Sequence, residues 1–141
     1  MDKKPSEYID GFLTFLRDAW SEYHMAGETE AGTDKETQDI LHWLEFHVGP
    51  DTDTCDLLKV AIELGVVRQR RREAKDTEMV TEPVVDWISK NESVKKGLER
   101  LLGDVRKAEK RTQNRCYMEK TNIMTEILGP PKEAARDEQE A

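Results

Sequence analysis

The chain has few of the residues that would indicate an exported, membrane or disulfide-rich protein. Its 141 residues include only two cysteines, Cys55 and Cys116, which are far apart and outside any Cys-x-x-Cys spacing. We expect both to be reduced thiols, with a disulfide between them as the less favoured alternative. No apolar run approaches the ~20 residues that a membrane-spanning helix requires, and the N-terminus lacks an apolar signal core. These absences predict a cytoplasmic protein that does not enter a membrane.

The motifs of common enzyme classes are also scarce. The eight glycines are scattered through the chain, so no glycine-rich loop is present to hold a phosphate. Cys116 has no histidine near it in the sequence to act as a base, which disfavours nucleophilic catalysis. We therefore expect a protein that is not an enzyme and that has no cofactor.

One segment offers side chains of the type that bind metals. Asp39, His42 and Glu45 are three residues apart and share one face of an expected helix, whereas His47 lies on its apolar face. A divalent ion would need a second set of ligands from another helix, and no second element of this kind accompanies the first. We expect no metal site, with His42 beside Asp39 at the surface and His47 in the core.

Charge, by contrast, is abundant and unevenly divided. Residues 1–67 hold fifteen Asp/Glu against five Lys/Arg, whereas residues 68–129 hold fifteen Lys/Arg against eleven Asp/Glu. The sign changes at Arg68-Gln69-Arg70-Arg71-Arg72, and the whole chain carries a net charge of −8. This excess repels nucleic acid at long range unless a local basic surface dominates. The division is typical of a binding protein, or of a bundle whose two halves neutralise each other.

Apolar residues recur at helical spacing and no segment alternates as a strand does, which predicts an all-α fold. We expect a bundle of four to five helices with a longer C-terminal helix. Ser6 is expected to cap a first helix that ends near Ala26, and residues 27–32 to form a turn. Thr33–Glu36 then has the pattern of a capping box for a second helix, which Gly49-Pro50 ends.

The second half predicts further helices. Residues 51–54 offer caps for a third helix that runs to about Lys75. Pro83 is expected at the start of a short fourth helix, because proline is favoured at the first helical position. The apolar positions expected to face inward in the third helix are Leu57, Leu58, Ala61 and Leu64.

The fourth helix is expected to end near Asn91, and Ser93 to cap a fifth helix. Residues 114–128 are either its continuation or a loop followed by a short helix from Thr121, and we favour a break near residues 115–117. A single helical domain is therefore expected over residues 1–129. A flexible acidic tail is expected over residues 130–141.

The arginine-rich segment is the first candidate binding site. On a straight helix, Arg68, Arg72 and Lys75 continue the inward stripe, Arg71 lies at its edge and Arg70 points to solvent. Charges that face the interior need carboxylates or a bound anion. The cluster Arg68, Arg71, Arg72 and Lys75 is thus an internal ion-pair network, a site for phosphate groups, or a solvated run.

The second candidate is a basic ridge on the fifth helix, formed by Lys96, Arg100, Lys107 and Arg111. At 1.5 Å per residue the ridge is roughly 22 Å long. It would follow a phosphate backbone or contact an acidic partner. The alternative is a solubilising face with ion pairs along the helix.

Several segments together resemble a group of small uncharacterised proteins carried by bacteriophages and integrated mobile elements of Firmicutes. They are Gln38–Glu45, Arg71–Asp76, Pro83–Trp87 and Leu101–Lys107, and the resemblance covers most of residues 8–117. It implies a mobile-element setting and an intracellular location, and it brings no catalytic residues.

Three functions remain open from these observations. The leading hypothesis is a non-enzymatic accessory protein that binds a macromolecular partner inside the bacterial cell. Its acidic half would imitate nucleic acid and occupy a basic groove on a host defence or replication protein. The second is a protein that binds DNA or RNA directly through its basic surfaces. The third is a structural protein whose acidic and basic halves pair between the subunits of a homodimer.

Overall fold

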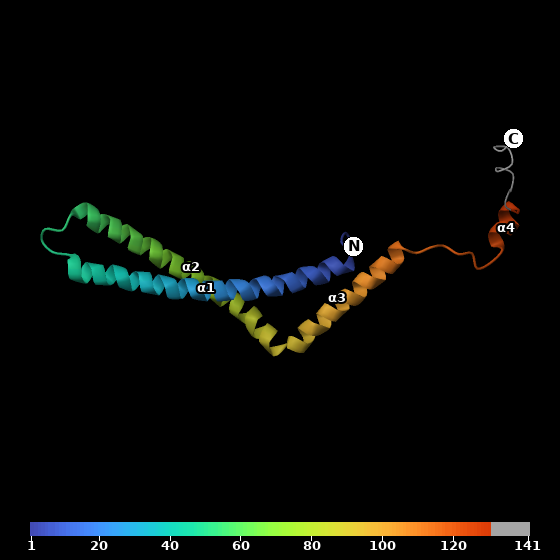
Figure 1. Ribbon diagram of the computed structural model, residues 1–141, viewed down its shortest axis with the longest axis horizontal. Helices are drawn as coiled ribbons and strands as arrows, with labels where there is room; N and C mark the ends of the chain where they lie inside the picture. The colour runs from blue at the N-terminus through green and yellow to red at the C-terminus, as the bar shows by residue number, and fades with distance from the viewer. Residues whose placement is uncertain (131–141) are drawn as a thin grey trace, which may run out of the picture. The chain divides into compact units, whose positions relative to one another are not determined.

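A computed structural model describes residues 1–130 and confirms the all-α class (Figure 1). Within these residues there are four helices and no strand. They are α1 (Pro5–His47), α2 (Thr54–Lys90), α3 (Glu92–Gln113) and α4 (Ile123–Leu128). The chain divides into a compact unit from Met1 to Lys107 and a second unit from Ala108 onward. The single domain over residues 1–129 stays a prediction, and most of the expected tail lies outside the described residues.

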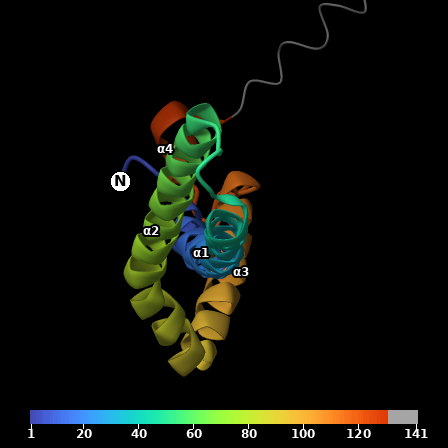
Figure 2. The same ribbon diagram turned by 90° about the vertical axis from the view of Figure 1, so that its left-hand side faces the viewer.

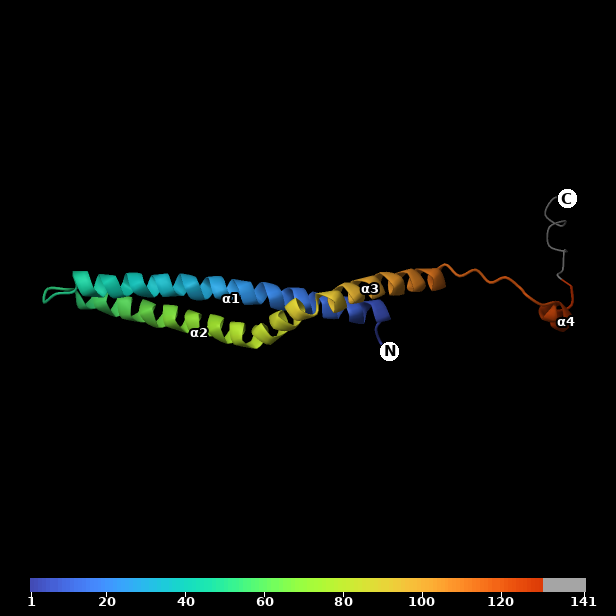
Figure 3. The same ribbon diagram turned by 90° about the horizontal axis from the view of Figure 1, so that it is seen from below.

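The first unit is built on a long antiparallel hairpin of α1 and α2, which lie side by side in Figures 1 and 3. Seen from the end that carries the connecting loop, α2 crosses α1 at an angle (Figure 2). The buried and half-buried side chains alternate at spacings of three and four residues on both helices. This heptad pattern is that of an antiparallel coiled coil.

We call the row of side chains through which the two helices pack the seam. On α1 it contains Leu16, Ala19, Tyr23, Ala26, Glu30, Thr33, Thr37, Ile40 and Leu44. On α2 it contains Leu57, Val60, Leu64, Val67, Arg71, Ala74, Glu78, Thr81, Val85 and Ile88. Three charged residues, Glu30, Arg71 and Glu78, occupy positions that are apolar in most coiled coils.

The expected division of α1 into two helices is wrong, because the helix continues through the segment that was predicted as a turn. Thr33, the expected cap, is buried in the seam with 1% of its surface exposed, and its hydroxyl donates to the carbonyl of Glu30. Helix propensity is a weak term that contact with α2 overrides here. The start also differs: α1 begins at Pro5, so Ser6 lies within the first turn.

The expected helix start at Pro83 is also wrong, since α2 runs unbroken from Thr54 to Lys90. Proline lacks the N–H that would bond the carbonyl of Met79, four residues earlier. Met79 is 64% exposed, so water can satisfy that carbonyl. A bend is the usual consequence, and α2 changes direction in its yellow part, which contains Pro83 (Figure 3).

The other helix ends agree with the sequence. Asp53 caps α2 by accepting from the backbone N–H of Cys55, and α1 ends just before Gly49-Pro50. The break after Lys90 is confirmed, although α3 begins at Glu92 and contains Ser93. The break near residues 115–117 is confirmed as well.

The bundle of four to five helices stays a prediction. The longer C-terminal helix is wrong, because α3 has 22 residues against 43 in α1 and 37 in α2. The prediction failed because residues 27–32 and Pro83 were expected to divide α1 and α2 into shorter helices, and neither does.

Candidate functional site

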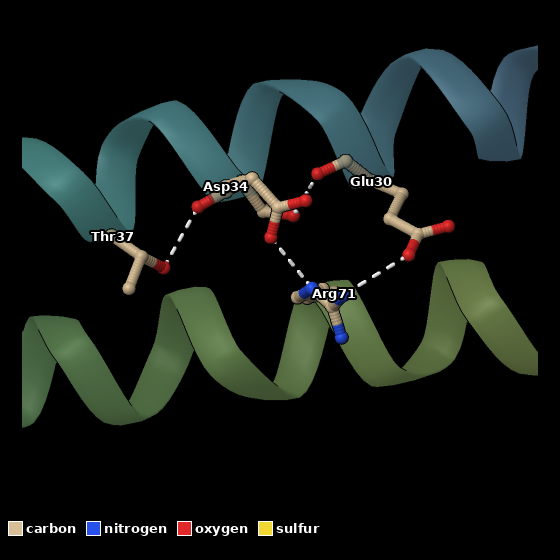
Figure 4. Close-up of polar contacts among 5 residues, drawn as sticks. Glu30, Asp34, Thr37 and Arg71 are labelled. Atoms are coloured by element: carbon tan, nitrogen blue, oxygen red, sulfur yellow. Dashed lines mark hydrogen bonds and ion pairs between the residues drawn. The ribbon is translucent and has the colours of Figure 1, made fainter.

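Arg71 is the centre of a charged cluster midway along the hairpin. From its seam position on α2, its Nε donates to Asp34 at 2.6 Å and its Nη2 donates to Glu30 at 3.1 Å (Figure 4). The side chains of Arg71 and Glu30 are 25% and 22% exposed, so the pair is partly shielded from water. The hydrogen bond that Arg71 donates to Asp34, and then the charges of Asp34, Glu30 and Glu78, raise the pKa of Arg71. The cation is therefore bound between two carboxylates of α1.

Glu78 lies one heptad beyond Arg71 and brings another carboxyl to the same cluster. A hydrogen bond with Glu30, then burial and the negative charges of Glu30 and Glu82, raise the pKa of Glu78. A Cβ placed on Gly27 would lie 3.0 Å from Glu78 Oε1, so glycine lets this carboxyl approach the backbone of α1.

The structure corrects the expected orientation of the arginine-rich segment. Arg68, Arg72 and Lys75 are exposed, and within residues 1–130 none of them forms an ion pair. Arg71, predicted at the edge of the stripe, faces α1. Arg70, predicted to point to solvent, is half-exposed and pairs with Glu36 at 3.3 Å. The predicted exposure of Arg70 is confirmed, whereas the choice of Arg68, Arg72 and Lys75 as the inward residues is wrong.

The error has a physical cause. The prediction used 3.6 residues per turn, whereas two helices that wind around each other keep a repeat of 3.5. Counting sevens from Leu57 gives Leu64, Arg71 and Glu78, which are all seam positions. The inward prediction also fails at Leu58 and Ala61, which are exposed because the seam passes through Leu57, Val60 and Leu64.

Sequence reasoning missed Glu30, Asp34 and Glu78. The first two fell in or beside the expected turn, so no face was assigned to them. The heptad count through Arg71 is the signal that would have found Glu78.

The basic ridge is present on α3. Lys96, Arg100, Lys107 and Arg111 are all exposed, and α3 is continuous over them. Arg106 lies off this ridge and reaches Asp10 of α1 at 3.6 Å. The ridge therefore presents four exposed cations to solvent.

The histidines and cysteines of the described residues do not form a cluster. His47 was predicted in the core and is exposed, stacked on Trp43 at 6.0 Å between ring centroids. His42 contacts the ring of Phe46, and the described residues contain no ion pair between His42 and Asp39. Within residues 1–130 no three His, Cys, Asp or Glu side chains are grouped as a metal would require. Both cysteines are exposed thiols.

The end of the hairpin near the connecting loop is an acidic surface, which we call the tip and define as residues 34–66. It contains eight Asp/Glu against two lysines, and none of its residues is buried. Asp34 and Glu36 pair with arginines of α2. The exposed carboxylates that form no ion pair within the described residues are Asp39, Glu45, Asp51, Asp53, Asp56 and Glu63.

Comparisons with protein-family models, with curated proteins and with solved structures find no match to this chain. No helix within residues 1–130 combines the length and the apolar character that a bilayer span would need.

Proposed function

We propose that this chain is a non-enzymatic binding protein that presents the acidic tip of its hairpin to a basic surface on a protein partner in a bacterial cell. The tip imitates nucleic acid and occupies a groove that would otherwise hold phosphates. Host defence and replication proteins carry such grooves, and the resemblance to proteins of bacteriophages and mobile elements favours partners of this kind.

The observation that carries the proposal is the density of exposed carboxylates on the tip. Six carboxylates of the tip are exposed and form no ion pair within the described residues. They lie along about 20 Å of helix axis, since residues 34–47 of α1 rise 1.5 Å each. That is roughly one per 3.3 Å, close to the one phosphate per ~3.4 Å of a single DNA strand.

The position of the positive charges supports the same proposal. Arg70 and Arg71 hold the carboxylates Glu36, Glu30 and Asp34 at the base of the tip. Beyond this point only two lysines, Lys35 and Lys59, oppose the acidic residues. A basic partner that approaches the tip therefore meets charged side chains that are mostly negative, which increases the association rate at low salt.

The test is capture of a partner from a bacterial lysate by two variants of equal charge. The tip variant combines Asp39→Asn, Glu45→Gln, Asp56→Asn and Glu63→Gln. The control neutralises four exposed acids elsewhere, with Asp2→Asn, Asp104→Asn, Glu119→Gln and Glu126→Gln. We expect wild type and control to capture the same protein after nuclease treatment, less of it as salt rises, and the tip variant to lose it. Equal capture by both variants would show that the tip charge is not recognised.

A second candidate function is direct binding of DNA or RNA. The observation in its favour is that Arg68, Arg72 and Lys75 are exposed on α2 without ion pairs in the described residues. The ridge on α3 adds four exposed cations. Capture that disappears on nuclease treatment and persists in the tip variant would favour this function over the first.

A further inference from the structure

We propose that two copies of this chain associate by exchanging α3, so that α3 of each copy lies in an apolar groove between α1 and α2 of the other. This interaction surface is separate from the acidic tip. It uses the opposite end of the hairpin, where apolar side chains are exposed.

The groove has a volume of about 500 Å³ and is lined by both helices of the hairpin. Phe15 and Val80, which contribute apolar surface from opposite sides, are 51% and 76% exposed. Phe12 and Trp87 extend the apolar surface, with their rings edge to face at 6.4 Å. A contiguous exposed patch of this kind marks an interaction site in a soluble protein.

The segment that fits the groove is a stripe on α3 formed by Val94, Leu98, Leu101 and Val105. Spacings of four, three and four residues place these side chains on one face of the helix. Val94 and Leu101 are 47% and 46% exposed, and the other two are half-buried. The neighbouring Leu102 is buried at 7%, and Leu98 and Val105 border its side of the helix, so α3 packs through an adjacent side and leaves Val94 and Leu101 uncovered.

The stripe and the groove match in length. The groove extends along α1 from Gly11 to Glu22, and the stripe runs from Val94 to Val105. Each spans eleven residue steps, or about 17 Å at 1.5 Å per residue.

The two surfaces also match in charge. The groove is lined by Asp18 and Glu22 and by no basic residue. Residues 92–107 of α3 contain five Lys/Arg against three Asp/Glu. An apolar stripe on a net basic helix therefore complements an apolar groove with an acidic edge.

The α3 that fills the groove must come from a second copy. Within one copy, α3 starts two residues after α2 ends and is held near Asp10 through Arg106 at 3.6 Å. Asp10, Leu13 and Arg17 line the space beside α3, on the opposite side of the seam from Phe15 and Asp18. Since every copy has one stripe and one groove, exchange between two copies satisfies both and closes as a symmetric dimer.

The test measures the molar mass of the full chain by light scattering over a concentration series. We expect the wild type to reach twice the 16.3 kDa mass of one chain. Leu101→Glu on the stripe and Phe15→Glu in the groove should each leave a monomer with unchanged helix content by circular dichroism. Val80→Glu is a second groove variant in case Phe15→Glu impairs folding. Ile62→Glu, at a residue on α2 that is 59% exposed and outside both surfaces, should remain a dimer.

Mixing the two monomeric variants tests the exchange itself. Phe15→Glu retains an intact stripe and Leu101→Glu an intact groove, so the mixture should form a heterodimer through one of the two contacts. A wild type that is monomeric throughout would overturn the proposal. A dimer that survives either variant would do the same, because it would indicate pairing of two grooves or of two α3 helices.

Discussion

The two ends of the hairpin differ in what they bury. Toward the chain's N-terminus, the contacts of α1 and α2 bury apolar side chains of both helices. They are Leu16, Ala19, Ala26, Ala74 and Ile88. At the tip, residues 34–66, no side chain is buried, and Ile40, Leu44 and Leu64 are only half-buried. This difference indicates that the packed end of the hairpin provides the stability. The tip provides a charged surface and has no buried side chains of its own to hold it in place.

Between these ends lies the polar part of the seam. Thr33 and Thr81 are buried, and each hydroxyl donates to a carbonyl of its own helix, so neither is left without a partner. Arg71 joins the two helices through Glu30 and Asp34. Apolar side chains allow two helices to pack in several registers. An arginine that must contact two carboxylates of the facing helix allows only one register. We interpret this cluster as the feature that fixes the register of α1 against α2.

The largest effect should come from truncating the apolar end. Leu16 is 2% exposed, so Leu16→Ala leaves a cavity and is expected to reduce the free energy of unfolding by about 3 kcal/mol. Leu58 is 61% exposed, and Leu58→Ala removes the same atoms from the surface at the tip. Its effect should stay within about 0.5 kcal/mol. Urea unfolding followed by circular dichroism measures both. Equal losses would mean that the two ends of the hairpin are equally important for stability.

Helix content and the ends of the two helices next to the connecting loop follow from local signals. Asp53 and Gly49-Pro50 act through the backbone within a few residues, so the sequence reveals them. Thr33 and Pro83 carry local signals that are as strong, yet the helix continues through both. Their context is set by a helix more than 30 residues away in the sequence, which no local rule includes.

Ion pairs between the two halves of the chain could be predicted from the sequence, but the residues that form them could not. The excess of arginine after an acidic segment indicated ion pairs between the two halves, and Arg70 and Arg71 form them. The choice of Arg68, Arg72 and Lys75 as the inward residues failed because an error of a tenth of a residue per turn accumulates along a long helix. Glu78 was missed because no heptad was counted through Arg71, and because its carboxyl partner Glu30 belongs to the other helix.

A smaller effect should follow from removing the arginine of the seam. Arg71→Gln leaves Glu30, Asp34 and Glu78 close together without their cation, so the melting temperature should fall. Arg72→Gln, the matched control, changes an exposed residue with no ion pair in the described residues and should have little effect. The fall should be greatest at neutral pH, where the carboxylates are charged. Identical melting temperatures for the two variants would contradict an ordering role for Arg71.

The smallest effect concerns the carboxyl of Glu78. Its pKa is raised above the ordinary 4.5 by the hydrogen bond with Glu30, by burial and by the charges of Glu30 and Glu82, with Lys75 acting in the opposite direction. The folded chain therefore binds this proton more tightly than the unfolded chain does. Between 4.5 and the raised pKa, the contribution of Glu78 to the free energy of unfolding decreases as pH rises.

Glu78→Gln isolates that contribution, because the amide still donates to Glu30 and never becomes charged. The variant should match or exceed the wild-type melting temperature at neutral pH. Its advantage should diminish as the wild-type carboxyl gains its proton on acidification. Glu63→Gln, at an exposed acid of the tip, serves as the control and should show no such trend. An advantage of Glu78→Gln that grows toward acidic pH would mean that Glu78 acts in the fold as a charged partner of Arg71, and the pairing with Glu30 would then be wrong.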